Sequence, residues 1–247
     1  MSPSLQPLVV IPARMASRRL PGKPLADVAG EPLIVRVWRV AVAAALGPVV
    51  VACAEPEIAD AITAAGGEAV LTRADHASGS DRVHEAVERL DPEGRHDVIV
   101  NLQGDMLARD SSFLRRILAP IEAGADIATL VKLITDPAEA ADPSVVKAVM
   151  SFAPGADVGR ALYFSRAAVP AGEGPLYHHI GVYAFRRAAL SRFVSLPRGS
   201  LEEREKLEQL RALEAGMRID AALVDTEALD INTPAGLDQA RALVSQG

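Results

Sequence analysis

The sequence predicts a single α/β domain built on parallel strands. Short apolar runs alternate with longer amphipathic segments along most of its 247 residues. Leu8 to Pro12 (LVVIP) has the length and β-branched content of a buried parallel strand. Asp97 to Gln103 (DVIVNLQ) is a second strongly apolar strand, and Gly104 and Asp105 stop it. In open α/β sheets the ligand crevice lies beyond the carboxyl ends of the strands, so we expect the loops after these two strands to open on one site.

The remaining elements follow from hydrophobic periodicity and from helix and strand stop signals. In the first half we expect helices at 32–45, 57–65 and 81–90, and strands at 48–52 and 69–71. In the second half we expect strands at 127–133, 145–150, 161–164, 180–185 and 219–224. Residues 201–214 are expected to form one helix, and 234–244 a last one. No repeat or domain-separating linker is recognisable, so one domain is expected.

Composition and charge exclude several classes of partner. A hydrophobic content of 49% is enough for a large core. The formal net charge of -6 gives no general attraction to polyanions, which argues against a nucleic-acid polymer or an anionic membrane surface. The most apolar stretch, Val40 to Ala54, is interrupted by Gly47 and Pro48 and is too short to span a bilayer. Cys53 is the only cysteine, which is typical of a cytoplasmic protein without disulfides.

Four cations crowd the loop that follows the first strand, namely Arg14, Arg18, Arg19 and Lys23. Like charges repel, so this crowding favours a polyphosphate ligand that neutralises them. Gly22 would let the backbone approach such a ligand closely. The loop matches neither the P-loop nor the dinucleotide-binding fingerprint. The alternative is an ordinary solvated basic loop.

Residues 11–25 (IPARMASRRLPGKPL) closely resemble the opening of 3-deoxy-manno-octulosonate cytidylyltransferases, which belong to the sugar nucleotidyltransferases. The resemblance implies a Rossmann-like nucleotide-diphospho-sugar transferase fold, with a mixed, mostly parallel sheet flanked by helices. It also implies that the loop wraps the triphosphate of CTP, with Arg14 and Lys23 as phosphate ligands and Arg19 as a third. Arg18 stands where the family often has an uncharged residue, and we do not expect it to bind.

The turn after the second apolar strand carries one carboxylate, Asp105, whose hard oxygens suit Mg²⁺. An Asp after a Gly is also common as a plain turn residue. The segment resembles the family motif QGDxP, in which the Asp binds magnesium, and this implies the same role for Asp105 and a place near the nucleotide for Gln103. Met106-Leu107 lacks the proline of the motif.

The second metal motif of the family, GVDTPxDL, resembles residues 230–237 (DINTPAGL). The metal aspartate of the family then falls on Asn232, whose amide oxygen contributes no charge. Asp230 lies two residues away and points to the same side of an extended segment, so we expect it to supply the missing carboxylate. The alternative is that Asp230 or Thr233 simply caps the last helix.

Residues 73–82 (RADHASGSDR) match the family signature TRxDHxSGTxR nearly residue for residue. The resemblance implies that this segment lies against the cytosine, through Arg73, Ser78, Gly79 and Ser80. A small hydroxyl and free backbone groups can recognise the amino and carbonyl edge of a pyrimidine. The alternative is a loop and a helix capped by Ser78 or Ser80, with purely structural roles for Asp75 and His76.

Three segments resemble the sugar-side motifs of the family: 162–170 (LYFSRAAVP), 177–186 (YHHIGVYAFR) and 207–211 (LEQLR). The resemblance implies that Arg166 meets the sugar carboxylate, that His179 and Tyr183 approach sugar hydroxyls, and that Glu208 and Gln209 hydrogen-bond to them. For the last two, a solvated helix face is the alternative. Zinc binding by the adjacent histidines is disfavoured, because neighbours in a strand point to opposite sides.

The resemblance covers nearly the whole chain, with its motifs in family order. It implies an Mg²⁺-dependent enzyme that transfers CMP from CTP to the anomeric hydroxyl of 3-deoxy-D-manno-octulosonate (Kdo) for lipopolysaccharide biosynthesis. It implies one domain over 1–247, with a nucleotide-binding part at about 8–150 and a sugar-binding part at about 151–215 that also forms a homodimer. Two alternatives stay open. One is a related acid sugar, such as amino-Kdo or a sialic acid, and the other is a non-catalytic nucleotide-binding paralogue, suggested by Asn232.

Overall fold

The computed structural model describes residues 4–17 and 19–245, so Arg18 of the basic loop lies outside the described residues. Two compact units make up the chain: residues 1–115 together with 227–247, and residues 116–226. The boundaries between the two units therefore lie at 115/116 and 226/227. The sequence instead suggested a boundary between a nucleotide-binding part and a sugar-binding part near residue 150. The reason is that the strand at 127–133 pairs with strands of the second unit.

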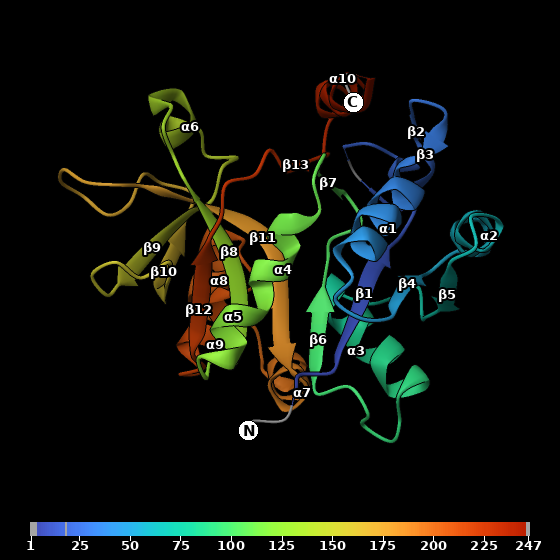
Figure 1. The fold of residues 1–247 in the computed structure, drawn as a ribbon, viewed down its shortest axis with the longest axis horizontal. Helices are drawn as coiled ribbons and strands as arrows, with labels where there is room; N and C mark the ends of the chain where they lie inside the picture. Colours follow the sequence, from blue (N-terminus) through green and yellow to red (C-terminus); the bar gives the residue numbers. More distant parts are fainter. Residues whose placement is uncertain (1–3, 18, 246–247) are drawn as a thin grey trace. The chain divides into compact units, whose positions relative to one another are not determined.

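The first unit is built on four parallel strands in the order β5 (Glu68–Leu71), β4 (Val49–Cys53), β1 (Pro7–Ala13) and β6 (Val98–Asn101). Every residue of β1 is buried, as expected for a parallel strand covered on both faces. Helices α1 (Leu33–Ala44) and α3 (Gly79–Leu90) lie on opposite faces of this sheet, and α2 (Pro56–Ala64) packs against β4 and β5 (Figure 1).

Several short elements of the first unit were not predicted. They are η1 (Lys23–Leu25), β2 (Asp27–Val28), β3 (Glu31–Pro32), β7 (Met106–Leu107), α4 (Ser112–Arg115) and β13 (Leu229–Asp230). The antiparallel pair of β7 and β13 has the largest effect on the position of distant segments. It holds the segment before the last helix, α10 (Pro234–Ser245), at the turn that follows β6. Residues more than a hundred positions apart are thereby brought to one place.

The second unit contains a mixed sheet in the order β11 (Tyr177–Arg186), β8 (Ile127–Leu133), β12 (Ile219–Leu223), β10 (Val158–Ser165) and β9 (Lys147–Phe152). Strands β12 and β8 run parallel, and the other pairs are antiparallel. Its helical elements are η2 (Arg116–Leu118), α5 (Ala119–Glu122), α6 (Pro137–Ala141), α7 (Arg187–Ser195), α8 (Ser200–Glu205) and α9 (Leu210–Glu214). The expected α/β class, with a mixed sheet flanked by helices, is confirmed. None of the described helices has the length and apolar character needed to cross a membrane.

The prediction of one continuous helix over 201–214 was wrong. Helix α8 ends at Glu205, and Lys206 adopts a left-handed conformation with φ 58° before α9 begins. The turn brings two buried side chains together, because Arg211 donates from Nε and Nη2 to the two carboxylate oxygens of Glu202, each over 2.7 Å. In a straight helix, nine residues would separate them by about 13 Å along the axis. The bidentate pair therefore requires the break.

Replacement of Lys206 by glycine should stabilise the second unit. A left-handed backbone costs a residue with Cβ about 1–2 kcal/mol, and glycine gives back part of this through its looser unfolded chain, so Lys206→Gly should raise the free energy of unfolding by about 0.5–1 kcal/mol. Urea titration followed by circular dichroism measures this. The control is Arg204→Gly, at an exposed position inside α8, which should lower the value by about 1 kcal/mol. Equal losses in both variants would contradict the left-handed break.

Candidate functional site

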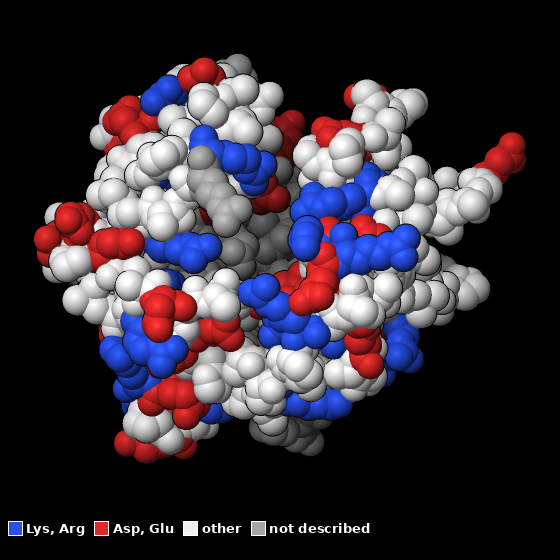
Figure 2. Space-filling model, turned by 180° about the vertical axis from the view of Figure 1, so that it is seen from behind, with Lys and Arg blue, Asp and Glu red and all other residues white. Residues whose placement is uncertain are grey.

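A cleft of about 470 Å³ opens in the first unit at the carboxyl ends of β1 and β6. It brings together eight residues that the sequence had singled out, namely Arg14, Arg19, Lys23, Ser78, Gly79, Gln103, Asp105 and Asn232. The loops after the two strands thus open on one site, as predicted from the position of strand ends in α/β sheets. On the face of the molecule drawn in Figure 2, basic and acidic residues are interspersed.

The basic loop is held by contacts of its backbone. The Met15 amide donates to the Glu55 carboxylate over 3.1 Å, and the Gly22 amide donates to the Met15 carbonyl over 3.2 Å. Gly22, the N-cap residue just before η1, has φ 71°, a conformation that would be strained in a residue with a side chain. The loop therefore folds back on itself through hydrogen bonds of its backbone. The charged groups of Arg14 and Lys23 are not used to close it and remain at the cleft.

A close approach at Gly104 sets the opposite wall of the cleft. A Cβ atom on this residue would lie 2.7 Å from the carbonyl oxygen of Pro12, a distance that real Cβ atoms do not show. The turn after β6 can therefore rest on the end of β1 only because residue 104 has no side chain. This contact places Asp105 beside the basic loop.

Lys23 joins the two walls. Its Nζ atom lies 2.5 Å from Oδ2 of Asp105 and 3.2 Å from Oδ1 of Asn232. Asn232 is brought there by the pairing of β7 with β13 and by a hydrogen bond from the Ile231 amide to the Asp105 carbonyl, over 2.9 Å. Two hard oxygen atoms from distant segments therefore converge on one cation.

Asp230 lies beside this group but does not line the cleft among the described residues. Desolvation of its carboxyl group by the surrounding protein and the negative charge of Asp105 raise the pKa of Asp230 to about 6. The positive charge of Lys23 acts in the opposite direction. Asp230 is exposed to solvent, so the nearby charge of Asp105 is the main cause of this rise. The helix cap is Thr233, whose hydroxyl accepts from the Gly236 amide over 3.1 Å.

The segment 73–82 divides between the cleft and the interior. Ser78 caps α3 in a reciprocal arrangement: its hydroxyl accepts from the Asp81 amide and its own amide donates to the Asp81 carboxylate. Ser78 and Gly79 line the cleft, whereas Ser80 is buried behind it and Arg73 points to solvent, 3.3 Å from Asp75. The roles predicted for Arg73 and Ser80 at the nucleotide stay predictions.

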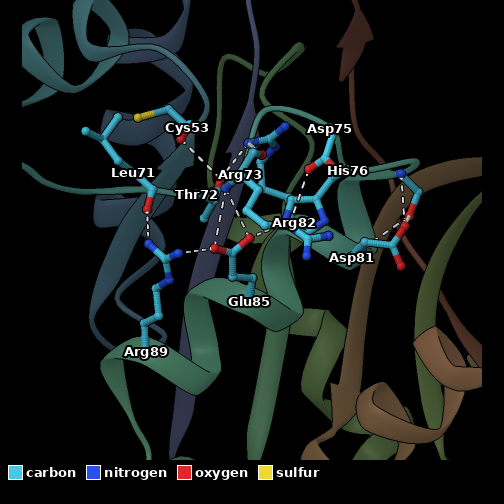
Figure 3. A network of polar contacts seen from close by, with 11 residues as sticks. Cys53, Leu71, Thr72, Arg73, Asp75, His76, Asp81, Arg82, Glu85 and Arg89 are labelled. Atoms are coloured by element: carbon cyan, nitrogen blue, oxygen red, sulfur yellow. Dashed lines mark hydrogen bonds and ion pairs between the residues drawn. The ribbon is translucent and has the colours of Figure 1, made fainter.

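The side chains of His76 and Glu85 are hydrogen-bonded within a polar network around the start of α3 (Figure 3). Glu85 also accepts from the Arg73 amide over 3.1 Å and pairs with Arg89. These contacts hold the loop before the helix, which is the structural role that the sequence left open for His76.

Sequence reasoning missed Arg82, which lines the same cleft. It is 2% exposed, and its Nη1 atom donates to the Thr72 hydroxyl over 2.5 Å and to the Arg73 carbonyl over 3.1 Å. Burial lowers the pKa of Arg82 from its usual value. A signal was present: Arg82 follows Gly79 by three positions in a helix, so both residues share one face.

The residues predicted to meet the sugar lie in the second unit. The Arg166 amide donates to the Glu205 carboxylate, and its Nε atom donates to the Glu205 carbonyl, each over 3.1 Å. The Ser165 hydroxyl donates to the same carboxylate over 2.9 Å. Glu205, which the sequence did not single out, thus fixes the end of β10 that carries Arg166.

His179 is 6% exposed, and its Nε2 atom lies 2.8 Å from the Thr129 hydroxyl. Burial and the neighbouring His178 lower the pKa of His179 to about 3, so the ring is neutral at pH 7. Tyr183 is its ring neighbour, with centroids 5.5 Å apart.

Gln209 is buried, and its Nε2 atom has no hydrogen-bond partner among the described residues. Contact of any of these residues with a sugar stays a prediction.

Comparison with known proteins gives a consistent result. A family model described as cytidylyltransferase matches residues 8–219. A 3-deoxy-manno-octulosonate cytidylyltransferase of Paramagnetospirillum magneticum is 64% identical over 97% of this chain and 98% of its own length. One from Methylobacterium radiotolerans is 62% identical over 96% of both chains.

Among solved structures, a CMP:2-keto-3-deoxy-manno-octonic acid synthetase complexed with CTP superposes with a TM-score of 0.88. It is 38% identical, with 98% of this chain and 99% of that chain covered. A UDP-glucose pyrophosphorylase complexed with UDP-glucose has a TM-score of 0.69 at 11% identity, covering 98% and 99% of the two chains, and shows a shared fold alone.

The cleft should bind a linear polyphosphate through the basic loop. Lys23→Met and Arg14→Met should each weaken the binding of inorganic tripolyphosphate, measured by calorimetry, about tenfold or more, or ~1.4 kcal/mol, because each removes a charge-assisted contact. The control is Arg109→Met, an exposed cation of the same unit away from this cleft. Unchanged affinity in both loop variants would remove the loop from the binding site.

Proposed function

Since the chain belongs to the cytidylyltransferase family, we propose that it transfers CMP from CTP to the anomeric hydroxyl of Kdo and releases pyrophosphate. The observation that carries the proposal is the cleft of the first unit, where the cations of the basic loop face the oxygens of Asp105 and Asn232. The relatives named for this reaction match over nearly their whole length, which supports both substrates.

The chemistry that we propose is an in-line displacement at the α-phosphorus. The anomeric oxygen of the sugar forms a bond to this phosphorus, the bond to the bridging oxygen breaks, and pyrophosphate leaves with that electron pair. Lys23 and Arg14 stabilise the charge that develops on the phosphate oxygens, with Arg19 as a further contact. Positioning and electrostatics supply the rate enhancement, and no covalent intermediate with the protein is needed.

Lys23 must change partners when the nucleotide binds. In the structure its ammonium group lies between Asp105 and Asn232, 2.5 and 3.2 Å from their oxygens. A triphosphate would compete with these oxygens for the lysine, and the release of Asp105 would leave its carboxylate available to another cation. The oxygens that converge on Lys23 are therefore the natural ligands of a divalent ion.

We propose that Asp105 and Asn232 hold Mg²⁺ together with phosphate oxygens. The residues fit such an ion, because both oxygens already point at one positive charge, and Mg²⁺ usually takes one or two carboxylates and completes its shell with water and phosphate. When bound, it would neutralise phosphate charge and polarise the phosphorus centre. Asp230, which we expected to supply the second carboxylate, lies outside the lining of the cleft among the described residues.

For the sugar we propose Arg166 as the partner of the Kdo carboxylate, since a guanidinium group binds a carboxylate bidentately. Its backbone and Nε atom are fixed by Glu205, while its Nη1 atom donates only to the Pro143 carbonyl, over 3.1 Å, among the described residues. Hydroxyl contacts from His179, Tyr183, Glu208 and Gln209 are part of the same proposal. A role in lipopolysaccharide biosynthesis follows from the identity of the sugar.

We further propose a cytoplasmic location and a homodimer that uses the segment 161–185. Cys53 is buried and free, in line with a reducing compartment. Leu162 on β10 is 53% exposed, and an apolar side chain exposed in one subunit is expected where a second subunit covers it.

The reaction is tested by pyrophosphate release with each of the four nucleoside triphosphates and with Kdo, its amino analogue or sialic acid. We expect turnover with CTP and Kdo above every other combination. Higher turnover with amino-Kdo or sialic acid would favour the related acid sugar. Absence of turnover with every pair, while CTP still binds in calorimetry, would indicate a non-catalytic paralogue.

The metal site is tested by titration of activity against Mg²⁺. Asp105→Ala should abolish turnover at any Mg²⁺ concentration that the assay tolerates. Asn232→Asp should lower the Mg²⁺ concentration needed for half-maximal activity, because a carboxylate adds a full charge beside a hard cation, and Asp230→Asn should change it little. The opposite pattern, with a large effect of Asp230→Asn alone, would assign the second ligand to Asp230. Full activity of Asp105→Ala would defeat the metal assignment.

A further inference from the structure

We infer that a second groove in the first unit binds a small fatty acid, through its carboxylate and its alkyl chain. The groove has a volume of about 410 Å³ and lies between α1, the end of β7 and α10 (Figure 1). Among the described residues it shares no lining residue with the cleft at the ends of β1 and β6, so the inference goes beyond the proposed transfer reaction. Its volume falls within the range of small-molecule sites, about 300–1,000 Å³.

The floor of the groove is apolar and comes from all three elements. Leu107 and Ala108 at the end of β7 are buried, and the side chains of Val40 on α1 and of Leu243 and Val244 on α10 are half-buried. Ligand sites are typically concave surfaces of this kind, with few polar groups around an apolar lining. The floor therefore indicates a ligand with a substantial apolar part.

The last turn of α10 is covered less well than the rest of the helix. Leu237, Ala240 and Val244 follow one another at helical spacing and share one face of α10. The first two are buried, whereas Val244 is half-buried and lines the groove. The apolar stripe thus continues beyond the turn that protein atoms cover, and an alkyl chain in the groove would complete its packing.

Three guanidinium groups surround the apolar floor, those of Arg36, Arg39 and Arg109. One carboxylate serves two of them, because Glu31 lies 2.8 Å from Nε of Arg39 and 4.0 Å from Nη1 of Arg36. Arg109 is exposed and makes no hydrogen bond or ion pair with another described residue. Its neighbour Asp110 accepts from Ser112 instead. The groove therefore carries an excess of positive charge, and the guanidinium group available to a ligand is that of Arg109.

A carboxylate suits this arrangement better than a phosphate group. A guanidinium group binds a carboxylate through two parallel hydrogen bonds. The single available charge of Arg109 balances one carboxylate, whereas a phosphate monoester carries a charge of about −1.5 to −2 at pH 7. An inorganic anion, which has no apolar part, would gain nothing from the floor. The combination of one cation and an apolar floor therefore points to a fatty acid.

The groove adjoins two elements that carry residues of the cleft. Leu107 follows Asp105 by two positions and pairs with Leu229 of β13, and α10 begins two positions after Asn232. A ligand that contacts both β7 and α10 would stabilise the arrangement that brings Asn232 to the cleft. Binding should therefore be visible as reduced mobility of α10.

Calorimetry of the wild-type protein with octanoate, decanoate and neutral 1-octanol tests the inference. Decanoate should bind about tenfold more tightly than octanoate, because each buried methylene group contributes about fourfold in affinity. 1-Octanol has the same chain without the charge and should bind at least tenfold more weakly than octanoate. Amide hydrogen exchange in α10 should slow when decanoate is added, which locates the ligand.

Two variants separate the charge from the apolar floor. Arg109→Met should weaken octanoate binding at least tenfold and leave the binding of 1-octanol unchanged. Val40→Phe fills part of the floor and should weaken the binding of both compounds at least tenfold. The matched controls are Arg198→Met and Val42→Phe, which make the same changes at exposed positions outside the groove and should bind both compounds like the wild type.

Equal affinity of the wild type for octanoate and 1-octanol would overturn the inference, as would octanoate binding that neither Arg109→Met nor Val40→Phe changes. Tighter binding of octyl phosphate than of octanoate would also overturn it, in favour of a phosphate ester. The wild-type comparisons need no variant, so they decide the matter even where a variant fails to fold, which thermal unfolding would reveal.

Discussion

The ammonium group of Lys23 is the interaction on which the cleft depends, because it holds together two segments that the chain order keeps far apart. Asp105 follows β6, Asn232 precedes α10, and both present an oxygen to the same nitrogen. Without the lysine, these two acceptor oxygens would lie near each other with no positive charge between them. A buried or half-buried carboxylate is tolerated only when it is paired, so the lysine serves as the internal counter-ion of Asp105.

The strands of the first unit and the place of the cleft could be predicted from the sequence because they depend on local pattern. A continuous apolar run such as residues 8–12 can be buried only in a covered parallel sheet, and the cations that follow it must lie at its carboxyl end. The break at Lys206 was not predictable in this way. No glycine or proline marks it, and its cause is a pairing of Glu202 with Arg211, a long-range contact that periodicity does not register.

In the candidate site, too, some residues could be predicted from the sequence, whereas others depend on long-range contacts. In the sequence, Arg14, Lys23 and Asp105 were singled out by their charge together with the family resemblance, whereas Asp230 was favoured over Asn232 because a carboxylate is the better ligand by chemistry alone. The structure places Asn232 at Lys23, since the register of β13 against β7 decides which residue reaches the cleft. Arg82 was missed for a related reason: helical spacing from Gly79 pointed to it, but only the three-dimensional arrangement shows that its buried side chain lines the cleft.

The division of the chain also has a consequence for its biosynthesis. The first unit is discontinuous, and its last part, residues 227–247, is made after the whole of the second unit. Domains generally fold as they leave the ribosome, from the N-terminal side onward. The nascent chain can therefore assemble β1, β4 and β6 early, but Asp105 has to wait for Asn232 and the β7–β13 pairing until the second unit has been synthesised. A chain released early, before residue 227, would keep the basic loop and lack the segment that carries Asn232 to the cleft.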